Sequence, residues 1–169
     1  TGHQRQSEAL ARIASGYLLE EKGIDTVVHT AQVKFKNRWS RGMLTLACFA
    51  AGPRSRLRFL KSALTPESYS AVTAVKPDIV VSCGSGAAPV NFIAGRDSGA
   101  KSVVIMDPGA LGTRRFDLCV IPRHDNPKEK SNVVVTRGAL NLIDEQYLRS
   151  CGAGLSSLVP GLGASKHVI

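Results

Sequence analysis

Residues 77–109 of the chain read PDIVVSCGSGAAPVNFIAGRDSGAKSVVIMDPG. An apolar run at 78–83 is followed by the glycine turn Gly84-Ser85-Gly86 and by a helical pattern from about 88 to 98. A second apolar run, 101–106, ends at an Asp-Pro-Gly loop. This order predicts a strand, a turn, a helix and a strand, which together form a βαβ unit. Because such crossovers are right-handed and place their two strands in parallel, the stretch predicts a parallel sheet.

The residues before this unit predict further helices and one more strand. The spacing of apolar residues over 6–22 is typical of an amphipathic helix. The β-branched run at 24–29 predicts a short buried strand. A second helix is predicted over about 44–63, broken or kinked at Gly52-Pro53.

Two more short strands are predicted after the unit, at 116–121 and 132–135, which brings the count to five. We therefore expect residues 1–149 to form an α/β, Rossmann-like parallel sheet with helices on both faces. Thr1-Gly2-His3 is typical of the loop after a first strand, so we expect that strand to be missing from this chain. Residues 150–169, rich in glycine, predict a linker toward an absent second domain.

The composition is that of one soluble globular domain. A chain of 169 residues, with 43% apolar and 21% charged residues, is long enough for one core and too short for two full domains. The 22 Lys and Arg against 13 Asp and Glu give a net charge of +9, which favours anionic partners such as phosphates, nucleotides or acidic lipids. The composition argues against nucleic acid as a partner, because aromatic residues make up only 5% and no basic stacking motif is present.

The four cysteines lie more than thirty residues apart and form no CxxC pair, so the sequence predicts neither a metal site nor a redox motif. No cofactor is predicted either. Widely spaced, buried cysteines favour a reducing, cytoplasmic location. The longest apolar run, 43–51, is far below the ~20 residues that span a bilayer.

The carboxyl ends of the predicted strands share one edge of the sheet, where open parallel sheets bind their ligands. We therefore expect substrate-binding residues in the loops that follow the strands. The candidates are Gly2, Gly84, Ser85, Gly86, Asp107, Thr136, Arg137 and Gly138.

The turn Gly84-Ser85-Gly86 can bring backbone N–H groups close to an anion at the start of the next helix. A plain tight turn is the alternative. As a dinucleotide fingerprint the sequence gives G-x-G-x-x-P, with Pro89 at the third glycine position and Asp107 where a ribose-binding acid is expected.

Three residues are candidates for catalysis. His124 with Asp125 could form a general base and its neighbour, and His3 is a second candidate base, because imidazole is well suited to proton transfer near neutral pH. Arg137 suits bidentate recognition of phosphate or carboxylate. The alternatives are solvated loop residues for the histidines and a structural ion pair for Arg137.

A run of basic residues predicts a second binding surface, one that could lie on an acidic membrane. With Leu57, Leu60 and Leu64 turned inward, the helix would present basic residues outward, and the protein would be peripheral to a membrane. An ordinary solvated helix face is the alternative. The basic residues are Arg54, Arg56, Arg58 and Lys61.

Three segments together resemble the mitochondrial fission Elm (elongated mitochondria) family. They are GHQRQS at 2–7, FDL running into PRHD at 116–125, and NVVVTRGAL at 132–140. The strand and glycine turn at 77–86 are also similar to the amino-terminal domain of the peptidoglycan N-acetylglucosaminyltransferase. Arg123 and the turn at 84–86 depart from the acidic residue and the Gly-Arg-Arg turn common among bacterial relatives.

This resemblance implies the amino-terminal, acceptor-side half of a glycosyltransferase-B-like protein. It implies that His3 is a base and that an anionic small molecule or nucleotide-sugar occupies the interdomain cleft, with the donor held mostly by the absent second domain. The expected reaction is inverting glycosyl transfer, and the isolated domain would be inactive. A non-catalytic, membrane-associated interaction module and a dinucleotide-binding domain are the alternatives.

Overall fold

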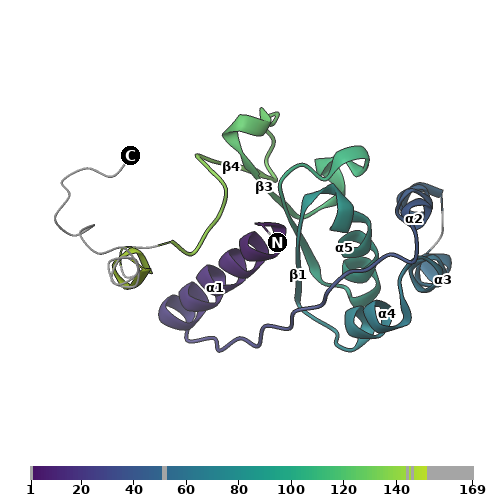
Figure 1. Ribbon diagram of the computed structural model, residues 1–169, viewed down its shortest axis with the longest axis horizontal. Helices are drawn as coiled ribbons and strands as arrows, with labels where there is room; N and C mark the ends of the chain where they lie inside the picture. Colours follow the sequence, from purple (N-terminus) through teal and green to yellow (C-terminus); the bar gives the residue numbers. More distant parts are fainter. Residues whose placement is uncertain (1, 51–52, 144, 146, 152–169) are drawn as a thin grey trace, which may run out of the picture.

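The computed structural model describes residues 2–50, 53–143, 145 and 147–151. In this part of the chain, four parallel strands form one sheet in the order β1-β2-β3-β4 (Figure 1). The fold is α/β and Rossmann-like, as the sequence predicts. Most of the predicted linker, 152–169, lies outside the described residues. The strands are β1 (Ile79–Cys83), β2 (Lys101–Ile105), β3 (Leu118–Pro122) and β4 (Val133–Thr136).

Helices cover both faces of the sheet. Helix α1 (Gly2–Lys22) contacts β1 from one side, and α5 (Gly84–Ser98) crosses from β1 to β2 on the other side (Figure 1). Helices α2 (Arg38–Ala50) and α3 (Pro53–Ala63) pack on α5, and α4 (Pro66–Thr73) packs on α3. Three short 3-10 turns connect the later strands: η1 (Gly109–Leu111), η2 (Thr113–Arg115) and η3 (Arg123–Asp125).

The main core lies between the sheet and α5. Val104, Cys119 and Ile121 of the central strands pack in one cluster with Ile93 of α5. Leu44, Leu60 and Leu64, on or beside α2 and α3, are at most 1% exposed and extend the same cluster. This face buries most of the apolar surface that stabilises the domain.

Two helices differ from the sequence prediction. Helix α2 ends at Ala50 and α3 begins at Pro53, so the predicted break is confirmed, and α2 begins six residues before the predicted start at Leu44. Helix α4 was not predicted, although Thr65 caps it and Pro66 occupies its first turn. Both residues are ordinary helix-start signals.

The predicted strand at 24–29 is wrong. These residues belong to no strand, and Val27 is 81% exposed. A β-branched run forms a strand only where a partner strand supplies hydrogen bonds. The described sheet therefore has four strands rather than five. None of the described helices is both long enough and apolar enough to cross a membrane.

Two predicted turns are helical. Helix α1 begins at Gly2, so Gly2 and His3 lie in its first turn rather than in a loop. Likewise Gly84-Ser85-Gly86 forms the first turn of α5, which begins directly after β1. The correction matters for function, because the first N–H groups of a helix have no partner within it.

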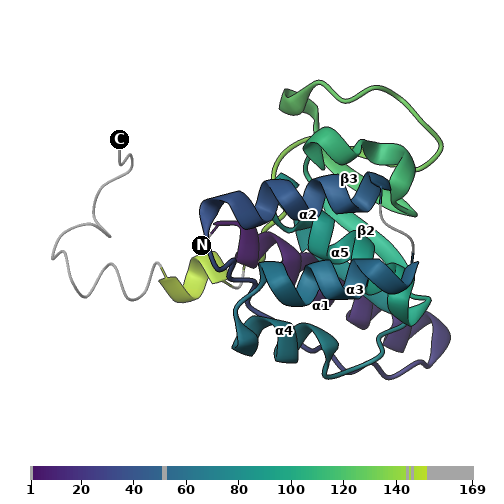
Figure 2. The same ribbon diagram turned by 90° about the vertical axis from the view of Figure 1, so that its right-hand side faces the viewer.

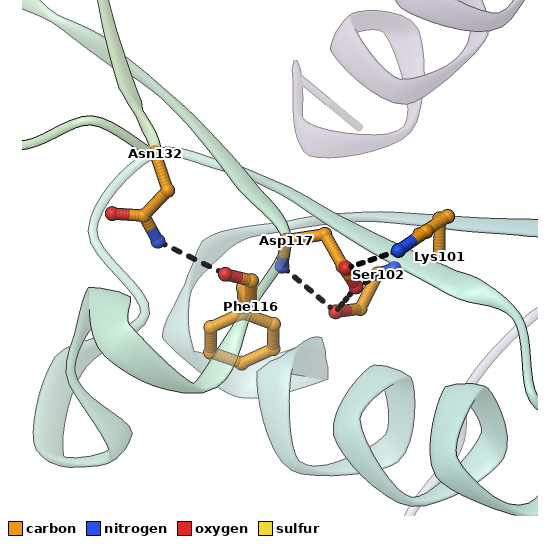
Figure 3. A network of polar contacts seen from close by, with 5 residues as sticks. All are labelled: Lys101, Ser102, Phe116, Asp117 and Asn132. Carbon is orange, nitrogen blue, oxygen red and sulfur yellow. Dashed lines mark hydrogen bonds and ion pairs between the residues drawn. The ribbon is translucent and has the colours of Figure 1, made fainter.

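A polar network ties β2 to the segment before β3 at the amino edge of the sheet (Figure 3). The backbone N–H and the hydroxyl of Ser102 both donate to Asp117 Oδ2 at 2.9 Å, and Lys101 Nζ lies 3.1 Å from Oδ1. Asn132 Nδ2 donates to the carbonyl oxygen of Phe116 at 2.9 Å. The hydrogen bond from the Ser102 backbone, with those from Lys101 and the Ser102 hydroxyl, lowers the pKa of Asp117 to about 2.

This shift predicts acid sensitivity. A carboxylate with a depressed pKa in the folded state stabilises the protein above its unfolded value near 3.8, and the contribution is lost as pH falls toward 2. Because the Asp117 side chain is 42% exposed, we expect only about 1 kcal/mol. Urea unfolding between about pH 5 and pH 2 should show that the free energy of unfolding falls less on acidification in Asp117→Asn than in the wild type. Asp97→Asn, which alters an exposed carboxylate, is the control. If the free energy of unfolding depends on pH in Asp117→Asn as it does in the wild type, the prediction is contradicted.

Candidate active-site cleft

A cleft of about 700 Å³ lies at the carboxyl ends of β1, β2 and β3. It therefore occupies the edge of the sheet where open parallel sheets bind ligands. The sequence-predicted residues that line it are His3, Gly84, Ser85, Gly86, Asp107 and Asp125. The other lining residues are Val33, Phe35, Arg41, Cys83, Ala87 and Met106.

The first turn of α5 supplies the positive side of the cleft. Gly84 has φ of +79°, which lets the chain turn directly from β1 into the helix. No acidic residue lies in this first turn, and Arg41 Nη1 from α2 is 3.9 Å from the position of a Cβ on Gly86. Free helix N–H groups beside a guanidinium favour an anionic ligand.

His3 reaches the cleft from the first turn of α1. Its Nδ1 lies 3.2 Å from Cys83 Sγ, and its ring lies against Gly84, where an added Cβ would be 3.2 Å from Cε1. Cys83 is 8% exposed, and burial raises the pKa of its thiol to about 11. Cys83 therefore stays protonated at neutral pH, and it positions His3 rather than acting as a thiolate nucleophile.

The end of β2 forms a second wall. Met106 has φ of +69°, which is rare for a residue other than glycine, and its N–H donates to the carbonyl of Val120 at 2.8 Å. Asp107 Oδ1 accepts a hydrogen bond from the N–H of Gly109 at 2.6 Å. Gly109 also has a positive φ, and an added Cβ there would be 3.0 Å from Ser85 Cβ. This close approach holds the Asp107 loop against the first turn of α5.

His124 and Asp125 lie at the end of β3, in η3. His124 Nε2 is 3.6 Å from Asp125 Oδ1, but only Asp125 lines the cleft, while His124 is exposed. The structure thus places His3, and not His124, beside the first turn of α5.

The other predicted residues lie outside the cleft lining. Thr136 Oγ1 donates to the carbonyl of Gly138 at 2.8 Å at the end of β4, and Arg137 is exposed. They share the carboxyl edge of the sheet, but β4 is separated from β2 by β3. Gly2 is exposed next to His3 and is not in the lining.

The cleft residues absent from the sequence prediction are brought in by contacts distant in sequence. Residues 34–36 run beside 63–65, with an antiparallel bridge between Phe35 and Leu64 and a hydrogen bond from Thr65 N to Lys34 O of 3.0 Å. This pairing places Val33, Phe35 and the following α2 with Arg41 at the cleft. No motif in the sequence signals it. Within the described ranges, no cluster of three or more His, Cys, Asp or Glu could hold a metal ion.

The basic run on α3 is only partly at the surface. Leu60 and Leu64 are buried, as predicted, and Leu57 packs partly buried against them. Arg56 is not directed outward, because its guanidinium lies 5.2 Å from the ring centre of Phe92. Arg58 and Lys61 are exposed, and the side chain of Arg54 lies outside the described part.

One comparison with known proteins gives a match. The sequence profile described as Mitochondrial fission ELM1 matches residues 1–168, nearly the whole chain. Searches of curated proteins and of solved structures found no significant match.

Proposed function

We propose, because the chain belongs to the mitochondrial fission ELM1 family, that its cleft is the acceptor side of a glycosyltransferase-B-like active site. The glycosyltransferase-B-like character is what the resemblance of the sequence implies. The observation that carries the proposal is a histidine beside the unpaired N–H groups of a helix first turn, in a cleft at the carboxyl edge of the sheet. A base beside an anion-binding turn suits transfer of a group from a phosphate ester.

In the proposed reaction an acceptor hydroxyl attacks the anomeric carbon of a nucleotide-sugar. The new C–O bond forms as the bond to the nucleoside diphosphate breaks, and His3 takes the hydroxyl proton. The first turn of α5 and Arg41 would hold a negative group of the acceptor or the leaving group. The donor would be bound mainly by the second domain that the resemblance implies.

The contact with Cys83 supports this role for His3. When Nδ1–H donates toward Cys83 Sγ, the lone pair remains on Nε2, the nitrogen that can then accept a proton from a ligand. The raised pKa of the Cys83 thiol keeps this partner uncharged. A second group that holds one tautomer is a common arrangement for a catalytic histidine.

His3→Gln is expected to lower glycosyl transfer by about a hundredfold, because it removes the proton acceptor while keeping a polar side chain. The assay uses the protein in its natural length with UDP-, GDP- and CMP-sugars. His29→Gln, which changes an exposed histidine, is the matched control. Binding of inorganic pyrophosphate, measured by calorimetry, should be retained in His3→Gln and weakened in Arg41→Gln.

Three results would argue against this function. They are no thermal shift and no turnover with any of the sugars, equal turnover in His3→Gln and the wild type, and pyrophosphate binding unaffected by Arg41→Gln. Calorimetric binding of NAD(P) that depends on Asp107 would favour the dinucleotide alternative instead.

A further inference from the structure

Helix α2 carries an apolar stripe that no part of the described chain covers. Leu44, Ala47 and Cys48 face the core, and the opposite side of the helix presents large apolar side chains to solvent. Their spacing of three or four residues places them on one helical face. Large exposed apolar side chains that gather on one helical face mark an interaction site more often than singly scattered ones do. The stripe consists of Trp39 (69% exposed), Met43 (60%), Leu46 (68%) and Phe49 (50%).

Positive charge surrounds the stripe. The guanidinium of Arg38 lies 4.9 Å from the ring centre of Trp39, and that of Arg115 lies 4.3 Å from the ring of Phe49. The exposed Arg58 and Lys61 lie on α3, which runs beside α2 (Figure 2). Between residues 26 and 66 the sequence has no Asp or Glu and eight basic residues, which account for most of the net charge of +9. They are Lys34, Lys36, Arg38, Arg41, Arg54, Arg56, Arg58 and Lys61.

The positive charge continues from the stripe to Phe92. Arg56, Arg96 and Arg115 place their guanidinium groups 5.2, 5.6 and 5.6 Å from the centre of its ring. None of the three forms an ion pair with a carboxylate in the described part of the chain. Three like charges so close together repel one another, so an external anion would be stabilised here.

We propose that the outer face of α2, with the exposed basic residues of α3, docks on an anionic lipid bilayer. The stripe would enter the boundary between headgroups and acyl chains, and Arg38, Arg58 and Lys61 would contact lipid phosphates. Tryptophan and arginine suit this depth, since each combines an apolar body with a polar end. The proposal is independent of catalysis, because none of the residues it uses lines the cleft. Arg41, on the same helix α2, does line the cleft but has no part in the docking.

This surface differs from the predicted one. The sequence predicts membrane contact through the basic run of α3 alone, but Leu60 and Leu64 are buried in the core and cannot enter a bilayer. The apolar component comes from α2 instead. Charge and exposed aromatic residues on one face favour lipid over an acidic protein, whose surface would offer the stripe no apolar phase.

Trp39 is the only tryptophan in the sequence, so its fluorescence reports directly on this face. The whole chain is mixed with phosphatidylcholine vesicles that contain about a third phosphatidylserine, and with pure phosphatidylcholine vesicles. We expect a blue shift of the Trp39 emission, quenching by brominated acyl chains, and co-sedimentation with the anionic vesicles only.

Two variants separate the apolar and charged components. Met43→Glu with Leu46→Glu should weaken vesicle binding more than about tenfold, because it removes two side chains from the apolar phase. Arg58→Glu with Lys61→Glu should weaken it by about tenfold and reduce its salt dependence. Ile13→Glu with Leu19→Glu, which alters two exposed apolar residues on α1, is the matched control and should bind as the wild type does.

Each variant is expected to fold, because every altered residue is exposed. Circular dichroism melts check this. The proposal is overturned if Trp39 shows no shift with anionic vesicles, or if the α2 variant binds as tightly as the α1 control. It is also overturned if polyglutamate or a DNA duplex shifts Trp39 while vesicles do not, because the partner would then be an acidic protein or a nucleic acid. Turnover of nucleotide-sugars is measured separately, so failure here leaves the proposed catalytic role untouched.

Discussion

Asn91→Asp is expected to lower the free energy of unfolding by about 3 to 4 kcal/mol. Asn91 is 1% exposed on the inner face of α5. Its amide nitrogen donates to the carbonyl of Val103 at 2.8 Å and that of Val80 at 3.2 Å, and lies 2.9 Å from Ser82 Oγ. Aspartate would replace this donor with an acceptor that faces two backbone carbonyls. A buried carboxylate that faces two carbonyl oxygens, with the Ser82 hydroxyl as its one nearby donor, is among the most destabilising single changes.

Urea unfolding at neutral pH measures this loss, and Asn141→Asp at an exposed position is the control, with a change within about 0.5 kcal/mol. The loss should shrink at acidic pH, because a protonated carboxyl can donate one hydrogen bond. Two observations would contradict the role given to Asn91. One is a loss at neutral pH no larger than that of the control, and the other is a loss that grows on acidification.

The βαβ unit to which Asn91 belongs could be predicted from the sequence. The strands at 79–83 and 101–105 and the helix between them follow one another in sequence, so their apolar pattern is local information. Their parallel pairing follows from the handedness of the crossover. The run at 24–29 is also rich in β-branched residues but pairs with nothing in the described sheet. Strand propensity without a partner strand is therefore insufficient.

The cleft could be predicted only in part, for a similar reason. The strand order brings the ends of β1, β2 and β3 together, so Gly84, Asp107 and Asp125 were found from the sequence. Cys83 and Arg41 were missed as cleft residues, because their roles depend on contacts with His3 and Gly86 about 80 and 45 positions away. The Thr136-Arg137-Gly138 group shares the edge but lies one strand beyond the cleft lining. Residues that share one edge of the sheet therefore need not line the same cleft.

Gly84→Ala is expected to damage the cleft more than its cost in stability suggests. A side chain at φ of +79° is strained by about 1 to 2 kcal/mol. The new Cβ would also lie 3.2 Å from His3 Cε1, so the imidazole must move by a few tenths of an ångström. That displacement would change the 3.2 Å contact between Nδ1 and Cys83 Sγ, which orients the imidazole in the cleft.

Gly99→Ala separates the effect of backbone strain from the effect of the contact with His3. Gly99 ends α5 with φ of +75°, and an alanine Cβ there would have nothing within 4 Å. Both variants should therefore lose similar stability in urea unfolding, within about 1 kcal/mol. Only Gly84→Ala should change the His3 ring signals in ¹⁵N NMR spectra and lower turnover, by about tenfold or more. If the two variants leave His3 equally undisturbed, Gly84 serves only the turn from β1 into α5. If Gly84→Ala alone displaces His3, the glycine is needed because a strand, a helix start and the candidate base meet at one point.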